Sequence, residues 1–376
     1  MKSHPALIAL TAGLFNIAYS PPALGQDDHS ADRPAAEISP SSPGARPNLN
    51  RSFGPVGLLA EFNSNENFGV LQSRLGAYRT HQAHANAGGP DKGYRDTFDN
   101  WVFPGKVTVS IPGSNGSWFV RAGGVAILSR THGGNLTRTE TDTYTGQLQA
   151  LRLIGNDTLV GAGIFVSDVS VDLLHNGGQV ETSGLGAQID FLHKLNDRFG
   201  ISGRAIYDGL DIHAEIPIGP DRKVVTERTG ERLYLEMSAV YNLPGEQVGF
   251  VPDGWRLRPV VTGIYQSISY DAGRNSFGAP IPAFTEEFGA LLLTARLEST
   301  EARPWKLAPY VTAGSEIQLR NNASQVDSDP GNLYLRAGVA MNTGGKGRLD
   351  LYYARRDSFE GTYQANNFSA VLSMLF

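Results

Sequence analysis

The sequence predicts an all-β protein: a transmembrane antiparallel β-barrel of about twelve strands, with fourteen as the alternative. About twelve segments within residues 117–376 alternate apolar and polar side chains, which is the period of a β-strand. Many of these segments exceed ten residues, whereas strands of soluble sheets typically have about five or six. A secretory signal opens the chain, and the last predicted strand ends on the aromatic residue Phe376, which we interpret as an assembly signal.

The composition excludes several classes of protein. With no cysteine among 376 residues, a disulfide framework, a cysteine-ligated zinc site and a thiol nucleophile are excluded. A formal net charge of −5 argues against a basic nucleic-acid-binding protein. No apolar run reaches about 18 residues, so no membrane-spanning helix is expected. The mean hydropathy of −0.23 is that of a soluble protein, but the two faces of barrel strands cancel on such a scale.

Residues 1–25 have the layout of a secretory signal peptide. Lys2 precedes the largely apolar stretch 6–19, and small residues at positions 23 and 25 lie just before Gln26. Residues 26–55 are rich in proline, serine and charged side chains, and we interpret them as a disordered linker or residual passenger.

Residues 56–80 fit a helix better than a strand. Phe68, Leu71 and Leu75 belong to a series of apolar residues spaced three or four apart. Residues 81–116 form a connecting segment. Within it, Lys106–Ile111 and the turn after it are candidates for an extra hairpin arm, which would give fourteen strands instead of twelve.

The predicted connections alternate in length along the barrel region. Residues 131–142, 175–183 and 214–230 are long polar links, whereas 155–157 and 196–197 are tight turns. Outer-membrane barrels have short periplasmic turns and longer external loops. The alternation therefore favours a membrane barrel over a soluble β-protein, which remains an alternative.

The order of motifs resembles the C-terminal translocator of bacterial autotransporters, the type V secretion family. The helix ends in the sequence LQSRLGAYR at residues 71–79, and a first strand follows with WFVRAGG at residues 118–124. The resemblance implies a twelve-stranded barrel with the helix running through its lumen, and export of an N-terminal passenger. Here only about 30 residues lie between the signal and the helix, so we predict little or no passenger. No Asn-Asn pair is present near Asn63–Asn67, so autocleavage is not among our predictions.

The polar faces of the predicted strands carry charges of both signs, including Arg320 on the face of Glu316. We interpret this face as the lining of a lumen that holds the helix; an open pore with anion preference is the alternative. The candidates for lumen-facing structural residues are Arg74, Arg121, Arg204, Arg232, Glu236, Arg258, Arg296, Glu316 and Arg336.

Three histidines near predicted external loops are the only candidates for surface chemistry. His132, His175 and His213 have Ser129, Asp172 and Asp211 close in sequence, but no esterase or metalloprotease motif is present. We predict no enzyme, no catalytic residue, no cofactor and no metal site, with a surface enzyme or adhesin acting through the loops as an alternative.

The functional prediction is an outer-membrane barrel of a Gram-negative bacterium that exports or displays a short N-terminal segment. Its expected partners are outer-membrane lipid, the barrel assembly machinery and periplasmic chaperones, with no nucleic acid. We expect a monomer.

Overall fold

The computed structural model describes residues 65–82, 96–132, 138–174, 177–219, 221–301, 303, 305–322, 330–343 and 347–375. The predicted signal peptide, the linker, the first part of the predicted helix, His175 and Phe376 lie outside the described residues.

One helix and a single large sheet make up the described chain. The helix is α4 (Glu66–Gln82), so the described helix begins ten residues after the predicted start. The long strands are β1 (Asp96–Ser110), β2 (Trp118–His132), β3 (Thr139–Ile154), β4 (Thr158–Leu173), β5 (Gly178–Lys194), β6 (Phe199–Pro217), β7 (Lys223–Tyr241), β9 (Trp255–Tyr270), β12 (Phe284–Ser299), β13 (Leu307–Asn321), β14 (Gly331–Asn342), β15 (Gly347–Ser358) and β16 (Tyr363–Leu375). Short pieces are β8 (Leu243–Pro244), η2 (Gly245–Gln247), β10 (Gly273–Arg274) and β11 (Pro280–Ile281).

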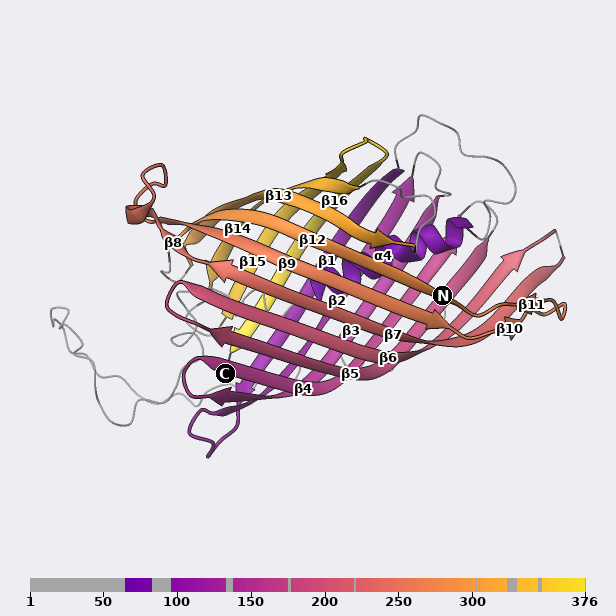
Figure 1. Ribbon diagram of the computed structural model, residues 1–376, viewed down its shortest axis with the longest axis horizontal. Coiled ribbons are helices and arrows are strands. Elements are labelled where there is room, and N and C mark those ends of the chain that lie inside the picture. Colours follow the sequence, from indigo (N-terminus) through magenta and orange to yellow (C-terminus); the bar gives the residue numbers. More distant parts are fainter. Residues whose placement is uncertain are drawn as a thin grey trace, which may run out of the picture. The chain divides into compact units, whose positions relative to one another are not determined.

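The sheet closes into a barrel. Fourteen strands share the sheet, and thirteen of them, all but the two-residue β8, form the closed wall (Figure 1). Neighbours in sequence pair antiparallel around the ring, and β1 closes it by pairing with β16. We call the end where β16 finishes the proximal end, and the end where β1 begins the distal end.

The extra strand β1 corrects the expected strand number. The hairpin arm suggested at Lys106–Ile111 is part of β1, which pairs along its length with β2. It adds one strand to the expected twelve rather than two. An odd number of up-and-down strands can close only with one parallel pair, and that pair is β1–β16.

Side chains alternate between the lumen and the outer surface, as the sequence predicts. Leu233, Leu235 and Met237 of β7 are exposed on the outside, whereas Arg232 and Tyr234 between them are buried inside. The same alternation holds in the other long strands, so a band of exposed apolar residues surrounds the barrel. Such a band is the surface that lipid covers in membrane barrels.

Three of the connections that the sequence predicts to be long are shorter in the structure. The links predicted at 131–142, 175–183 and 214–230 shrink to a few residues each, because the strands continue through them. Polar residues in these segments continue the pairing between strands beyond the apolar band. Glu215 on β6, for example, lies opposite Val225 on β7. Period and pairing, and not polarity, decide where a strand ends.

Arg320 lies on the outer surface and not on the lumen face. The register between β12 and β13 shifts at Gly289/Ala290, so Gly289 pairs with Arg320 but Ala290 pairs with Gln318. A bulge of one residue turns every side chain beyond it to the other face. Arg320 therefore forms an ion pair with Glu287.

The helix lies inside the barrel, in its distal half. Figure 1 shows α4 in indigo, surrounded by strands, in the half nearer to β10 and β11. Its first turn contacts Tyr352 at the middle of β15, and Ala77 packs with Phe98 and Tyr363 at the distal end. In the described part of the chain, no helix combines the length and the hydropathy required to cross a bilayer.

The apolar band generates a prediction about lipid contact. Leu335 is an exposed residue at the centre of β14, and Leu335→Arg will lower the unfolding free energy in lipid vesicles by about 2–4 kcal/mol. The control is Thr285→Arg, exposed at the distal end of β12, with a cost of about 0–1 kcal/mol. Equal effects of the two substitutions in urea titrations would show that the band does not face the hydrocarbon.

Candidate functional site

The candidate site is the lumen together with the helix that occupies it. Phe68 lies at the centre of the contact. Its ring meets Phe165 and Tyr234 edge to face, with centroids 5.1 and 5.2 Å apart, and the guanidinium of Arg232 lies 4.7 Å from its centroid. Leu71 and Leu75 complete the apolar cluster. The helix is therefore packed against the wall as in a protein core.

Two glycines allow the helix to approach the strands closely. A Cβ at Gly69 would lie 2.7 Å from Cδ1 of Ile127, and one at Gly76 would lie 3.3 Å from Cγ2 of Val171. A side chain at Gly69 would have to displace the end of Ile127, and one at Gly76 would require Val171 to move by a few tenths of an ångström. These glycines set the distance of α4 from β2 and β4.

Charged side chains connect the helix to strands β13, β14 and β15. Arg74 donates to Glu316 on β13 at 3.1 Å, and both side chains are more than nine-tenths buried. Glu66 accepts from Arg336 on β14 at 3.1 Å and from the hydroxyl of Tyr352. A buried charge of this kind is destabilising once its partner is removed.

Polar contacts hold the rest of the helix. Gln72 accepts from Arg232 at 3.0 Å and donates to Gln266 at 2.5 Å. The amide of Asn65, just before the helix, donates to Gln147 and Gln188 at 3.3 and 3.4 Å. Strands from all around the ring thus contact α4, which occupies the distal half of the lumen.

Two carboxylates in the wall each contact more than one guanidinium group. Glu298 lies 2.6, 3.0 and 2.7 Å from Arg256, Arg258 and Arg296. Asp190 lies 2.8 Å from Arg204 and 3.8 Å from Arg121. In these two groups, five guanidinium groups share two carboxylates.

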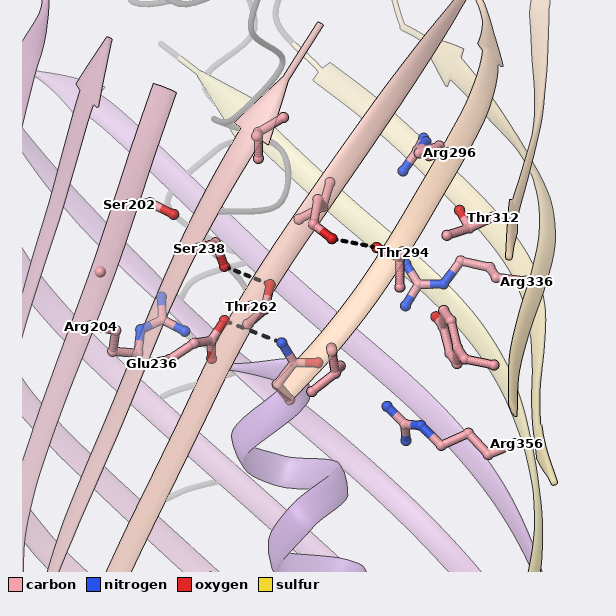
Figure 2. A pocket seen from close by; sticks show the side chains of 16 residues that line it. Ser202, Arg204, Glu236, Ser238, Thr262, Thr294, Arg296, Thr312, Arg336 and Arg356 are labelled. Carbon is pink, nitrogen blue, oxygen red and sulfur yellow. Dashed lines mark hydrogen bonds between the residues drawn. The ribbon is translucent and has the colours of Figure 1, made fainter. Parts of the chain in front are cut away.

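A pocket of about 130 Å³ lies in the lumen beside the first turn of the helix. Figure 2 shows Arg204 and Glu236 on one side and Arg336, Arg356 and Arg296 across from them. Hydroxyl groups line the wall between them, and Ser238 and Thr262 lie 2.8 Å apart. Four guanidinium groups and a single carboxylate therefore face the same cavity.

Comparison with known proteins identifies the family. The family model described as the autotransporter β-domain matches residues 118–354, more than half of the chain. This chain belongs to the autotransporter β-domain family. The family match begins at the first residue of β2, so α4 and β1 of this autotransporter barrel precede it.

A solved autotransporter barrel shares the fold. The chain is similar to the translocator domain of the autotransporter NalP from Neisseria meningitidis, with a TM-score of 0.50 and 15% identity over 81% of this chain and 94% of that one. The β-domain of the Bordetella autotransporter BrkA has a TM-score of 0.47 and 13% identity, over 62% of this chain and 88% of that one. No curated protein matches the sequence.

The nine lumen candidates of this autotransporter barrel all come from the inner face or the helix. Arg74 and Glu316 pair with each other, Arg336 pairs with Glu66, and Glu236 accepts from Asn67 at 3.2 Å. Arg121 and Arg204 share Asp190, Arg258 and Arg296 share Glu298, and Arg232 bonds to Asp208 at 3.0 Å. Their role as the lining that holds the helix stays a prediction.

Sequence reasoning missed the carboxylate at the helix start and the tyrosines opposite it. Glu66 lies where the three- and four-residue spacing of apolar side chains in the predicted helix is interrupted, so the pattern did not identify it as a lumen residue. Tyr352 and Tyr334 alternate correctly with outer residues, and the guanidinium of Arg336 lies 4.0 and 5.6 Å from their ring centroids. Alternation placed these residues inside, but only the fold brings them to one point.

The histidines lie far from the lumen contacts. His132 is on the outer face of β2, 3.7 Å from Asp99, while Ser129 points inward. His213 lies between Glu215 and Glu227, at 3.4 and 3.5 Å. Across the described ranges, no group of three or more His, Cys, Asp or Glu side chains is arranged to hold a metal ion.

The Arg74–Glu316 pair generates a prediction about docking of the helix. Arg74→Met removes a buried guanidinium and leaves Glu316 with Arg356 and the amide of Asn332, each 3.5 Å away. We expect a loss of about 3 kcal/mol in docking free energy, or roughly 150-fold in the exposed fraction. The measurement is the maleimide labelling rate of a cysteine placed at the buried Ser73 of this cysteine-free chain.

The matched control is Arg138→Met, which removes an exposed arginine at the start of β3. Its labelling rate will equal that of the parent. If Arg74→Met labels no faster than this control, the ion pair does not hold the helix.

Proposed function

We propose that this chain is an outer-membrane translocator of a Gram-negative bacterium that displays a short N-terminal segment at the cell surface. It would act without catalysis, as a monomer inserted by the barrel assembly machinery after escort by periplasmic chaperones. The docking of α4 in the lumen carries this proposal. A helix held there by buried charge pairs and glycine contacts is the chain segment that directly precedes the barrel.

The direction of the helix is that of a state in which the N-terminal segment has not yet been displayed. Asn65 lies at mid-lumen, and the chain runs from there toward the distal end, where β1 begins. If the proximal end faces the periplasm, the start of α4 points to the periplasm. To reach the outside, residues before Asn65 would then have to turn back and pass the distal half of the lumen, which α4 occupies.

The cationic pocket supports a second candidate function, a pore with anion preference. Arg204, Arg296, Arg336 and Arg356 line it against Glu236 alone. Each of these arginines nevertheless has a carboxylate within 3.5 Å. Paired guanidinium groups and a helix in the distal half favour a closed translocator over an open pore.

Display is tested with an epitope tag placed after Gln26 in the full chain. We expect antibody to bind the tag on intact cells whose barrel fractionates with outer membranes and migrates faster on gels before heating than after it. The same tag at the proximal turn, after Asn156, is the control and will stay inaccessible until the cells are opened.

Two results would overturn the proposal. A tag after Gln26 that becomes accessible only when cells are opened would exclude display. Steady conductance of the full chain in planar bilayers, unchanged on deletion of residues 26–80, would instead establish the pore.

A further inference from the structure

The single parallel pair of the barrel indicates that β1 is a strand inserted between β2 and β16. We call the line along which β2 and β16 would otherwise meet the seam. Every other pairing in the wall is antiparallel, and β1 alone runs in the same direction as its neighbour β16. The family match begins at β2, immediately after β1. Bacterial single-chain barrels have even strand numbers, and without β1 the wall would have twelve.

The pairing of β1 with β16 is weakened at its centre. The ladder runs from Asp96↔Tyr363 to Val102↔Ser369 and resumes only at Gly105↔Leu372. Pro104 lies in the gap, and proline has no backbone N–H to donate. Parallel ladders are also slightly less stable per residue than antiparallel ones.

The strands on either side of β1 match each other in register. The partner lists place Phe103 opposite Ala126 of β2, and Val102 opposite Ser369 of β16, the residue before Ala370. With β1 removed, Ala126 would face Ala370. The two strands would then pair antiparallel with no slip, so inner residues meet inner residues and outer residues meet outer ones.

Two buried hydroxyls at the seam support the direct pairing. Ser129 on β2 and Ser369 on β16 are buried, and neither hydroxyl bonds to another described residue. Asn367 instead bonds to Asn100 of β1 at 2.7 Å. In the direct register Asn367 would lie opposite Ser129, where its amide can bond to the free hydroxyl.

We propose that the edges of β2 and β16 form a binding site for an extended strand, which β1 fills in parallel and from which it can be released. The twelve remaining strands then close by direct pairing of β2 with β16. The ligand class is a polypeptide strand whose outer face is apolar, as Trp101 and Phe103 are here.

Release of β1 has a consequence that rests on the proposed function. With β1 in the wall, the chain enters it at the distal end. With β1 released, the wall begins at the proximal end with Trp118, so residues 96–117 are free to run inside the lumen. The start of α4 then has the length of chain required to turn toward the distal end, which display needs.

The test uses cysteine pairs in the full cysteine-free chain. Ala126→Cys with Ala370→Cys reports direct closure. With β1 between them the two residues are two strand spacings apart, roughly 10 Å, and a disulfide requires about 7 Å or less between Cα atoms. Thr97→Cys with Gln364→Cys reports β1 in place, because these residues are partners.

We expect both pairs to form disulfides in oxidised outer membranes, the second pair at once and the first over time. Pro104→Val restores the missing donor to the ladder and will lower the yield of the first disulfide at least threefold. The overturning result is a first pair that never exceeds its single-cysteine controls while the second pair forms fully. A first disulfide that forms in cells whose epitope tag stays inaccessible would refute display, but it would still support the release of β1 and direct pairing of β2 with β16.

Discussion

The whole structure depends on the compensation of buried charge inside a closed sheet. A barrel whose outer band is apolar must place its polar residues in the lumen, where water is scarce once a helix enters. Some buried carboxylates are then shared: Glu298 by three arginines and Asp190 by two. Glu316 pairs with Arg74 of the helix and with Arg356 of β15.

The helix and the wall therefore stabilise each other. The carboxylate of Glu316 needs a cation, and the helix needs the aromatic contact around Phe68 and the close approach at Gly69 and Gly76. Docking removes apolar helix surface from water and satisfies charges of the wall in one step. The proximal half lacks a described helix and keeps a cavity lined by guanidinium groups.

The fold was predictable because period-2 alternation fixes which residues face inward, and it did so for Arg232, Glu316 and Arg336. Three features were not predictable. Polar residues of β6 and β7 remain paired beyond the apolar band, so loop lengths were overestimated. A bulge in β13, between Gln318 and Arg320, reverses Arg320, and no local pattern marks it.

The third feature is the parallel strand. Alternation in β1 is interrupted by Pro104 and Gly105, and its position depends on a partner more than 250 residues away in sequence, which no local pattern encodes. The helix contacts have the same origin, since Glu66 and Tyr352 meet only when the sheet closes.

A disulfide between the helix and the wall tests most directly whether α4 is docked in the lumen. A cysteine at Gly76 would place its Cβ 3.3 Å from the present Cγ2 of Val171, so Gly76→Cys with Val171→Cys should cross-link completely on mild oxidation in outer membranes. The pair of Gly76→Cys with a cysteine at Leu185, which points outward, should not. Absence of the first cross-link in folded barrels, or equal yields of the two, would contradict the docked helix.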